Sequence, residues 1–225
     1  MNSLKRKAFE GLVFLFAVLC LVLFLPAWTI FYPQAWAYLF VFFVSVTAIT
    51  LYLMKRDTAL LERRMTAGPG AEKEKSQKVI QFFAQFAFIS IYVLSALDHR
   101  FGWSAVPVSI IVIGDILVAL GLFIVFLVFK ENTFTSGIIE VGKEQTVIST
   151  GPYAIVRHPM YIGALLMLLG TPIALDSWWG LLTMIPFTFV IIVRLRNEEK
   201  FLLKNLPGYT EYFGKVRYRL VPGIY

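Results

Sequence analysis

Long runs of apolar residues recur along the 225-residue chain and limit the folds that it can adopt. A helix needs about 20 apolar residues to cross the roughly 30 Å hydrocarbon core of a bilayer. Four runs reach this length, and a fifth run is interrupted only at Asp176-Ser177. The runs are 12–31, 35–54, 79–97, 108–129 and 162–193. With 58% hydrophobic residues and a mean hydropathy of +0.73, the chain predicts an all-α, polytopic membrane protein with about five to six transmembrane helices. We expect one domain over 1–225, with 162–193 as a short helical hairpin and 194–225 as a cytoplasmic segment.

The net charge of +7 is distributed unevenly along the chain. With six crossings, three basic residues before the first run, seven in 55–78, three in 130–161 and seven in 194–225 fall on one side. Arg100 is the only basic residue of the opposite connections. By the positive-inside rule, this pattern predicts that both termini are cytoplasmic. The basic excess therefore favours contact with anionic membrane lipids, and we expect no nucleic-acid partner.

Several polar features receive a structural interpretation. Cys20 is the only cysteine, so no intrachain disulfide is possible, and we expect no metal site. The charged segment 55–78 is interpreted as a solvated connector on the lipid surface, and His99 as solvated. Asp115 is an acidic residue within a predicted membrane span and is therefore a candidate functional residue. The favoured interpretation is that its side chain reaches the membrane interface or pairs with a neighbouring hydroxyl. The basic start and apolar run 12–31 are interpreted as a retained first helix.

Two polar segments flank the predicted hairpin. The loop 130–161 contains GPYAIVRHPMYIG from Gly151 onward, and the tail begins RLRNEEKFL at Arg194. Because a hairpin returns the chain to the side from which it entered, we expect these two segments to meet at the membrane surface. The Arg157-His158 pair would then face the Glu198-Glu199 pair.

The residues of the two segments suit a polar ligand. Pro159 favours a helix start, whose free N–H groups attract an anion, and Arg157 offers a bidentate donor. Tyr153 and Tyr161 offer aromatic faces and hydroxyls, while the glutamates accept from ribose hydroxyls or an ammonium. A zwitterionic, nucleoside-bearing ligand at the bilayer edge would satisfy all of these groups. The alternative is an ordinary juxtamembrane anchor, because Arg, Tyr and Trp are common at membrane interfaces.

The motif resembles that of the isoprenylcysteine carboxyl methyltransferase family, whose wider group includes membrane phospholipid methyltransferases. GPYAIVRHPMYIG, RLRNEEKFL and GYTEYFGKVRYRLVPGI carry the resemblance, which covers roughly residues 108–225. It implies an integral membrane methyltransferase that takes S-adenosylmethionine from the cytosol, without the Rossmann fold of soluble methyltransferases.

The resemblance also implies roles for individual residues. The cofactor-binding residues would be Gly151, Tyr153, Arg157, His158, Pro159, Met160, Tyr161, Glu198 and Glu199. Within this set Arg157 would brace the loop or reach an anionic group, 147–151 would give backbone contacts, and Glu199 would support Glu198. Arg194 and Glu198 would be catalytic, with Arg194 facing the acceptor.

The sequence leaves the acceptor open. A carboxylate, such as that of an isoprenylcysteine or another lipophilic small molecule, needs no general base but does need a cation such as Arg194. A phospholipid amine would instead need Glu198 or Glu199 as its base. Two other functions are possible interpretations of the sequence: a membrane sterol-type reductase that uses NADPH, and a non-enzymatic transporter or assembly factor. The sequence does not predict the oligomeric state.

Overall fold

The computed structural model, which describes all residues except 1–2, 67, 69, 73, 143 and 225, is mainly helical. Five helices are long and apolar enough to cross a membrane, so the fold expected from the sequence is confirmed and the chain is an integral membrane protein. The α-helices are α1 Ser3–Ala27, α2 Pro33–Arg56, α3 Thr58–Met65, α4 Lys75–Phe101, α5 Val108–Glu131, α6 Pro159–Ala174, α7 Met184–Asn205 and α8 Tyr209–Lys215, with short 3-10 helices η1 Gly151–Ala154 and η2 Trp179–Thr183. No strand occurs among the described residues.

Local sequence signals set several of these boundaries. Asp57 caps α3 by accepting a hydrogen bond from the backbone N–H of Leu60 at 2.8 Å. Gly102 ends α4 in the left-handed conformation, which a glycine adopts without steric cost. Pro159 begins α6 at its first position, where its missing N–H is not needed.

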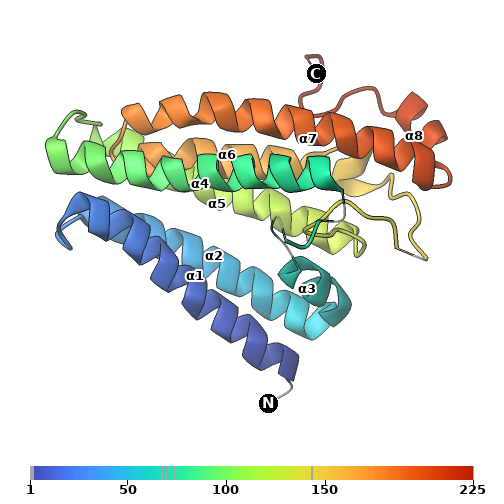
Figure 1. Cartoon of the computed structure of the whole chain (residues 1–225), viewed down its shortest axis with the longest axis horizontal. Helices are drawn as coiled ribbons and strands as arrows, with labels where there is room; N and C mark the ends of the chain where they lie inside the picture. The colour runs from blue at the N-terminus through green and yellow to red at the C-terminus, as the bar shows by residue number, and fades with distance from the viewer. Residues whose placement is uncertain (1–2, 67, 69, 73, 143, 225) are drawn as a thin grey trace.

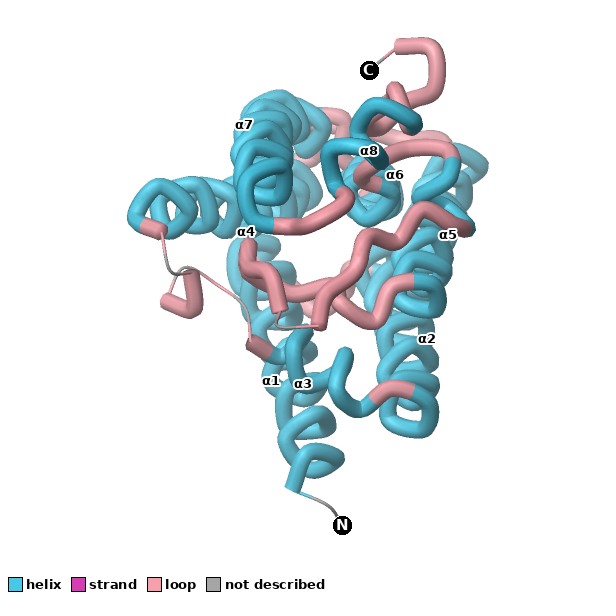
Figure 2. The backbone as a smooth tube through the Cα atoms, turned by 90° about the vertical axis from the view of Figure 1, so that its right-hand side faces the viewer, coloured by secondary structure: helices cyan, strands magenta, loops and turns pink. Residues whose placement is uncertain are grey.

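The helices form two groups that diverge toward one end. Helices α4, α5, α6 and α7 make one bundle, while α1 and α2 lean away from it and α3 lies in the opening (Figure 1). The turns at 28–32, 102–107 and 175–178 meet at one end, here called the turn end. The loops after α5 and around α8 gather at the other end, here called the loop end (Figure 2).

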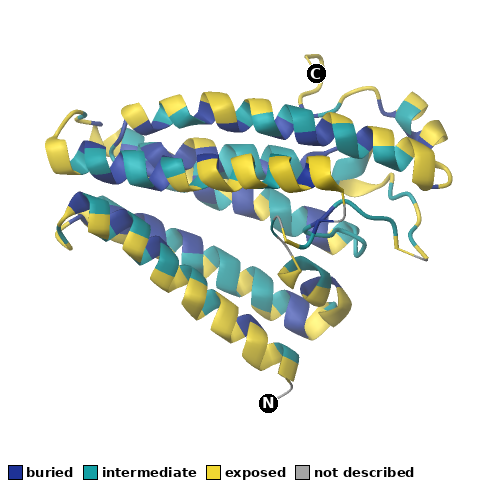
Figure 3. Ribbon diagram, viewed as in Figure 1, coloured by how far each residue is buried: buried dark blue, intermediate teal, exposed yellow. Residues whose placement is uncertain are grey.

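Exposed residues lie on the outer faces of the helices and buried residues lie between the helices (Figure 3). Many of the exposed residues are large and apolar. Phe14, Phe40 and Ile185 each expose 71% of their surface. Water would penalise exposed apolar area on this scale, whereas lipid tails do not. The exposure therefore marks the lipid-facing side of these helices.

The α5–α6 pair is the closest helix contact and depends on small residues. A Cβ on Gly121 would come within 2.5 Å of the Gly163 carbonyl oxygen, and one on Gly114 within 2.4 Å of the Ala174 nitrogen. Glycine at such positions lets membrane helices approach until their backbones touch. This contact fixes where α6, and therefore the RHPMY motif at its start, lies against α5.

The structure differs from the expected hairpin in the length of its second helix. α7 does not end near residue 193 but continues to Asn205, so that Arg194, Glu198 and Glu199 all lie on it. Each of these three side chains is hydrogen-bonded to another part of the protein. The charges therefore do not end the helix at the point where the apolar run stops. The first run also ends earlier than expected, at Ala27, and Trp28 turns the chain in a left-handed conformation.

Three other expectations need correction. Segment 55–78 is not a solvated connector throughout, because Leu60 and Glu72 are buried. His99 is not freely solvated, since its ring stacks on Tyr32 at 3.7 Å between centroids. Asp115 is half-buried on α5, and its Oδ1 finds no hydrogen-bond partner within the described part of the chain.

Candidate functional site

A cavity of about 620 Å³ opens at the loop end, in the size range of small-molecule sites. Its wall comes from α2, α3, α4, α5, the loop after α5, α6, α7 and the tail. Of the residues that the sequence singled out, those on the wall are Val147, Ile148, Tyr153, Arg157, His158, Met160, Tyr161, Arg194 and Glu198. Gly151, Pro159 and Glu199 are not part of the wall.

Glu199 is the centre of a buried polar cluster behind the wall. Its Oε1 accepts from Arg157 Nε at 2.7 Å and lies 3.3 Å from His158 Nε2, while its Oε2 accepts from Arg219 Nε at 2.8 Å. The Glu199 side chain is only 4% exposed, so these partners replace the water that the carboxylate loses. Glu199 therefore anchors the RHPMY motif and does not contact the cavity.

Arg157 also ties the tail to the motif. Its Nη1 donates to the carbonyls of Val216 and Arg217 at 2.6 and 2.8 Å, and its guanidinium lies over the Phe213 ring. Backbone N–H groups of Arg157 and His158 donate to the carbonyls of 218 and 219. The segment before α6 and the C-terminal tail are thus joined by backbone and side-chain bonds together.

Glu198, one residue earlier on α7, points the other way. It lines the cavity, and its Oε2 accepts from the Tyr161 hydroxyl at 2.5 Å. The two glutamates face different surroundings, because adjacent side chains on a helix point about 100° apart. The Glu199 carboxylate is bonded to Arg157 and Arg219, whereas the Glu198 carboxylate faces the cavity.

Two tyrosines complete the polar end of the cavity. Burial raises the pKa of Tyr153 to about 12, with the Glu198 carboxylate adding to the effect and the bond from Asn132 opposing it. Burial is also the main cause that raises the pKa of Tyr209, whose hydroxyl has no hydrogen-bond partner within the described residues. Both phenols therefore stay protonated at neutral pH. Tyr209, 4% exposed and on the cavity wall, leaves a buried hydroxyl for a ligand to satisfy.

Two arginines from segments far apart in the sequence, Arg64 and Arg194, both line the cavity. Arg194 on α7 donates from Nη2 to Glu72 at 2.8 Å, and its Nη1 has no partner among the described residues. Arg64 on α3 donates from Nη1 to the Ser136 carbonyl at 2.5 Å and lies over the Phe129 ring. Sequence reasoning missed Arg64 and Glu72 because only long-range folding brings the 55–78 segment to the site.

Beyond the polar end, the cavity continues between the helices along apolar side chains. Phe42, Phe88, Leu122, Met167 and Phe187 line this part. They lie in the middle or the turn-end half of their helices, away from the loop end. The cavity therefore has a charged part at the loop end and an apolar arm that extends among the spanning helices.

A comparison with known protein families points to the same region of the chain. The sequence model of the phospholipid methyltransferase family matches residues 109–207, which include the RHPMY motif, Arg194 and both glutamates. The cobalt-zinc-cadmium resistance protein CzcN of Cupriavidus metallidurans is 28% identical over 126 residues, or 55% of this chain. The aligned part is 56% of that protein, so the chain spans about half the length of the curated relative that it matches. Residues 109–207, which supply α5, α6 and α7 to the cavity wall, are therefore the part of the chain that is similar to the phospholipid methyltransferase family.

Proposed function

We propose that the chain is a membrane methyltransferase that uses S-adenosylmethionine and methylates the carboxylate of a lipophilic acceptor, such as an isoprenylcysteine or a similar small molecule. The single observation that carries the proposal is one cavity that joins the Glu198 carboxylate, the guanidinium groups of Arg64 and Arg194, and an apolar arm. The family of residues 109–207 supports the reaction class.

The donor would occupy the part of the cavity next to the RHPMY motif. The residues fit it, because Glu198 presents a carboxylate to an ammonium or ribose hydroxyl and Tyr209 presents a hydroxyl with no protein partner. Tyr153, Met160 and Tyr161 give aromatic and thioether surface beside these groups. When bound, S-adenosylmethionine supplies an electrophilic methyl group whose bond to sulfur breaks as the acceptor oxygen attacks.

The charges around the cavity favour an anionic acceptor. The wall carries the cations Arg64, Arg157 and Arg194 and the carboxylates Glu140 and Glu198. With Glu72, Glu199 and Arg219, which form ion pairs directly behind this wall, four positive and four negative charges balance before a ligand enters. S-adenosylmethionine carries a net positive charge, so a carboxylate acceptor restores neutrality. An ammonium acceptor would add a second positive charge to a partly desolvated cavity, which is costly.

The chain's own residues would then act by positioning and desolvation. A carboxylate is already ionised at pH 7, so the reaction needs no general base. Orientation of the two reactants can supply as much as roughly 7–11 kcal/mol of the barrier reduction. Arg194 and Arg64 would hold the acceptor while the apolar arm takes its lipid chain and excludes water from the reacting oxygen.

A phospholipid amine is the second candidate acceptor, favoured by the description of the matching family. In that case Glu198 would have to remove a proton from the amine, with Tyr161 releasing its hydrogen bond to the carboxylate. A nicotinamide-dependent reductase stays a more distant alternative.

The test begins with calorimetric titration of detergent-purified protein with S-adenosylhomocysteine and NADPH, using wild type, Glu198→Gln and His158→Ala. We expect micromolar binding of S-adenosylhomocysteine only, weakened about tenfold or more by Glu198→Gln because a charge-assisted hydrogen bond is lost. Methyl transfer is then measured to N-acetyl-S-farnesylcysteine and to phosphatidylethanolamine vesicles. Turnover of the carboxylate supports the proposal, turnover of the amine alone replaces the acceptor, and no binding by folded wild-type protein removes the function.

A further inference from the structure

The carboxylate of Glu72, on the loop between α3 and α4, is buried inside the protein. The Glu72 side chain is only 1% exposed, although the sequence around it is strongly charged. Its Oε1 accepts from Arg194 Nη2 at 2.8 Å, and its Oε2 accepts from the backbone N–H of Ile139 at 3.2 Å. Both oxygens are therefore committed to groups of the cavity wall, while Glu72 itself does not line the cavity.

Stability alone does not account for this buried pair. Removing two charges from water costs several kcal/mol per ion, and their attraction often does no more than offset that cost. Other bonds already join the preceding residues 57–64 to the loop after α5: Arg63 donates to the Thr133 carbonyl, Thr133 donates to Asp57, and Arg64 donates to the Ser136 carbonyl. The bond of Glu72 adds to these a contact between the α3–α4 loop and Arg194 on α7.

The pair does, however, fix the direction of Arg194. A guanidinium is planar, with its donors in a rigid fork, so a bond to one terminal nitrogen restricts where the other can point. Nη2 is held by Glu72 and lies 3.4 Å from the Gly137 carbonyl. Nη1 is left without a partner among the described residues, on a side chain that is 9% exposed and lines the cavity.

A buried, unpartnered Nη1 on a cavity wall calls for an anionic ligand group, because a buried donor without a partner is costly. Gln81 on α4 reinforces this end of the cavity, with its Nε2 donating to the same Gly137 carbonyl at 3.4 Å. The apolar arm begins along α4 in the next turns, at Ala84 and Phe88. An acceptor with its carboxylate at Arg194 would therefore have its lipid chain directed into the arm.

We propose that Glu72 is a positioning residue for the acceptor: it orients Arg194 so that Nη1 receives the acceptor carboxylate, and it thereby makes the enzyme select a carboxylate over a neutral group. This inference rests on the proposed function. Its consequence is that acceptor selectivity depends on a residue outside residues 109–207, on the loop before α4.

The experiment compares Glu72→Gln with Glu74→Gln in the purified full chain. Glu74 is the matched control, since it lies two residues away in the same loop, is exposed and makes no side-chain cap bond. The measured quantities are the Kd of S-adenosylhomocysteine, kcat and KM for N-acetyl-S-farnesylcysteine, and the Kd ratio between that acid and its neutral amide.

Wild type and Glu74→Gln are expected to prefer the acid by about tenfold or more, the size of one charge-assisted hydrogen bond. In Glu72→Gln the preference falls below about threefold and KM for the acid rises about tenfold, while the Kd of S-adenosylhomocysteine stays within about twofold. In an Arg194→Lys background, Glu72→Gln has little further effect, because both changes act through the same contact.

Three results overturn the proposal. The first is a Glu72→Gln protein that keeps the wild-type preference for the acid. The second is an equal loss of donor and acceptor affinity, which indicates a merely structural role. The third is a full additional effect in the Arg194→Lys background. If Glu72→Gln does not fold, Glu72→Asp is measured in its place and judged by the same ratio. Wild-type protein that fails to bind S-adenosylhomocysteine overturns the proposed function itself, and this inference with it.

Discussion

At the scale of single residues, the buried Glu199 carboxylate depends on its hydrogen-bond partners to replace the water that it loses on folding. Arg157→Ala would leave this carboxylate, which is 4% exposed, without its 2.7 Å partner and would also free two carbonyls of the tail. Breaking one side of a buried ion pair costs about 3–5 kcal/mol. We expect the unfolding midpoint to fall by roughly 10 °C and donor binding to be lost with the tail.

Arg217→Ala is the control for this prediction. It removes one positive charge from the same segment, but its side chain is exposed and its backbone carbonyl, which Arg157 uses, is retained. Differential scanning of both variants in the same detergent makes the comparison. An Arg157→Ala protein that melts within a degree or two of wild type would contradict the role assigned to the cluster.

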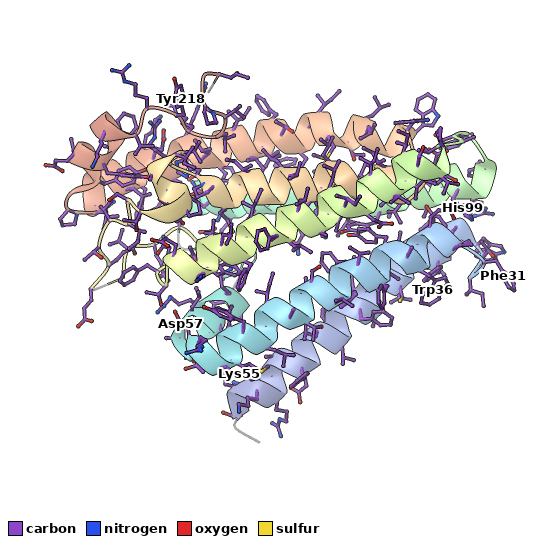
Figure 4. The ribbon with its side chains drawn as sticks, turned by 180° about the vertical axis from the view of Figure 1, so that it is seen from behind. Phe31, Trp36, Lys55, Asp57, His99 and Tyr218 are labelled. Atoms are coloured by element: carbon purple, nitrogen blue, oxygen red, sulfur yellow. The ribbon has the colours of Figure 1, made fainter. Side chains whose placement is uncertain are left out.

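The Tyr161 hydroxyl has a different task, because it holds the carboxylate that faces the cavity. Tyr161→Phe keeps the ring but removes the 2.5 Å hydrogen bond to Glu198. We expect the Kd of S-adenosylhomocysteine to rise by about tenfold, since a hydrogen bond to a charged group contributes about 1.5–3 kcal/mol. Calorimetric titration measures it, with Tyr218→Phe at an exposed position as the control (Figure 4). Unchanged affinity would place the donor elsewhere.

The sequence could predict the part of the site that lies in continuous motifs. Arg157, His158 and Tyr161 share one short segment, and the two glutamates stand together, so local chemistry identifies them. Glu72 and Arg64 could not be found in this way, because their segment looks like a solvated surface loop. Only the three-dimensional packing of that loop against α7 and residues 132–139 gives these two charges a function.

At the scale of helices, the α5–α6 contact decides where the motif lies. Gly121→Ala would place a methyl carbon about 2.5 Å from the Gly163 carbonyl oxygen and the Met167 nitrogen, both of them backbone atoms that cannot rotate away. We expect a loss of about 1–3 kcal/mol of stability from overpacking. Gly11→Ala in α1 is the control, since nothing lies within 4 Å of its added methyl group.

Thermal unfolding of the two alanine variants tests this contact. Gly11→Ala should be neutral or slightly stabilising, because alanine favours a helix by up to about 1 kcal/mol over glycine. Equal midpoints for the two variants would mean that α5 and α6 are not packed backbone to backbone. Sequence periodicity predicted these two helices as apolar segments but not their contact, because a glycine gives no signal of what it approaches.

At the scale of the whole molecule, the paths of the helices determine which compartment each end of the cavity faces. Phe31, Trp36 and His99 lie at the turn end, while Lys55, Asp57 and Tyr218 lie at the loop end (Figure 4). The basic residues follow the loop end, with Arg100 as the exception. Under the positive-inside rule the loop end, with both termini and the polar part of the cavity, would be cytoplasmic.

The α6 helix is the element on which this topology depends, because its 16 residues extend only about 24 Å. Its end nevertheless reaches the turn end. The Tyr32 hydroxyl donates to the Leu175 carbonyl at 2.5 Å, the Val106 N–H donates to Asp176 at 2.7 Å, and Ser177 donates to Asp98 at 2.6 Å. The tip between α6 and α7 is thus tied to both of the other turns. We therefore predict that α6 crosses the whole membrane and that this tip is extracytoplasmic.

Single cysteines introduced into a Cys20→Ala chain test this prediction in intact cells. Trp178, at the tip, and Arg100, at the α4–α5 turn, are exposed at the turn end, and Lys200 is exposed on α7 toward the loop end. A membrane-impermeant maleimide should label Trp178→Cys and Arg100→Cys directly, and Lys200→Cys only after permeabilisation. Labelling of Arg100→Cys from outside with Trp178→Cys protected would mean that the α6–α7 tip does not emerge. Labelling of Lys200→Cys alone would invert the molecule and turn the polar part of the cavity away from the cytosol, where S-adenosylmethionine is made.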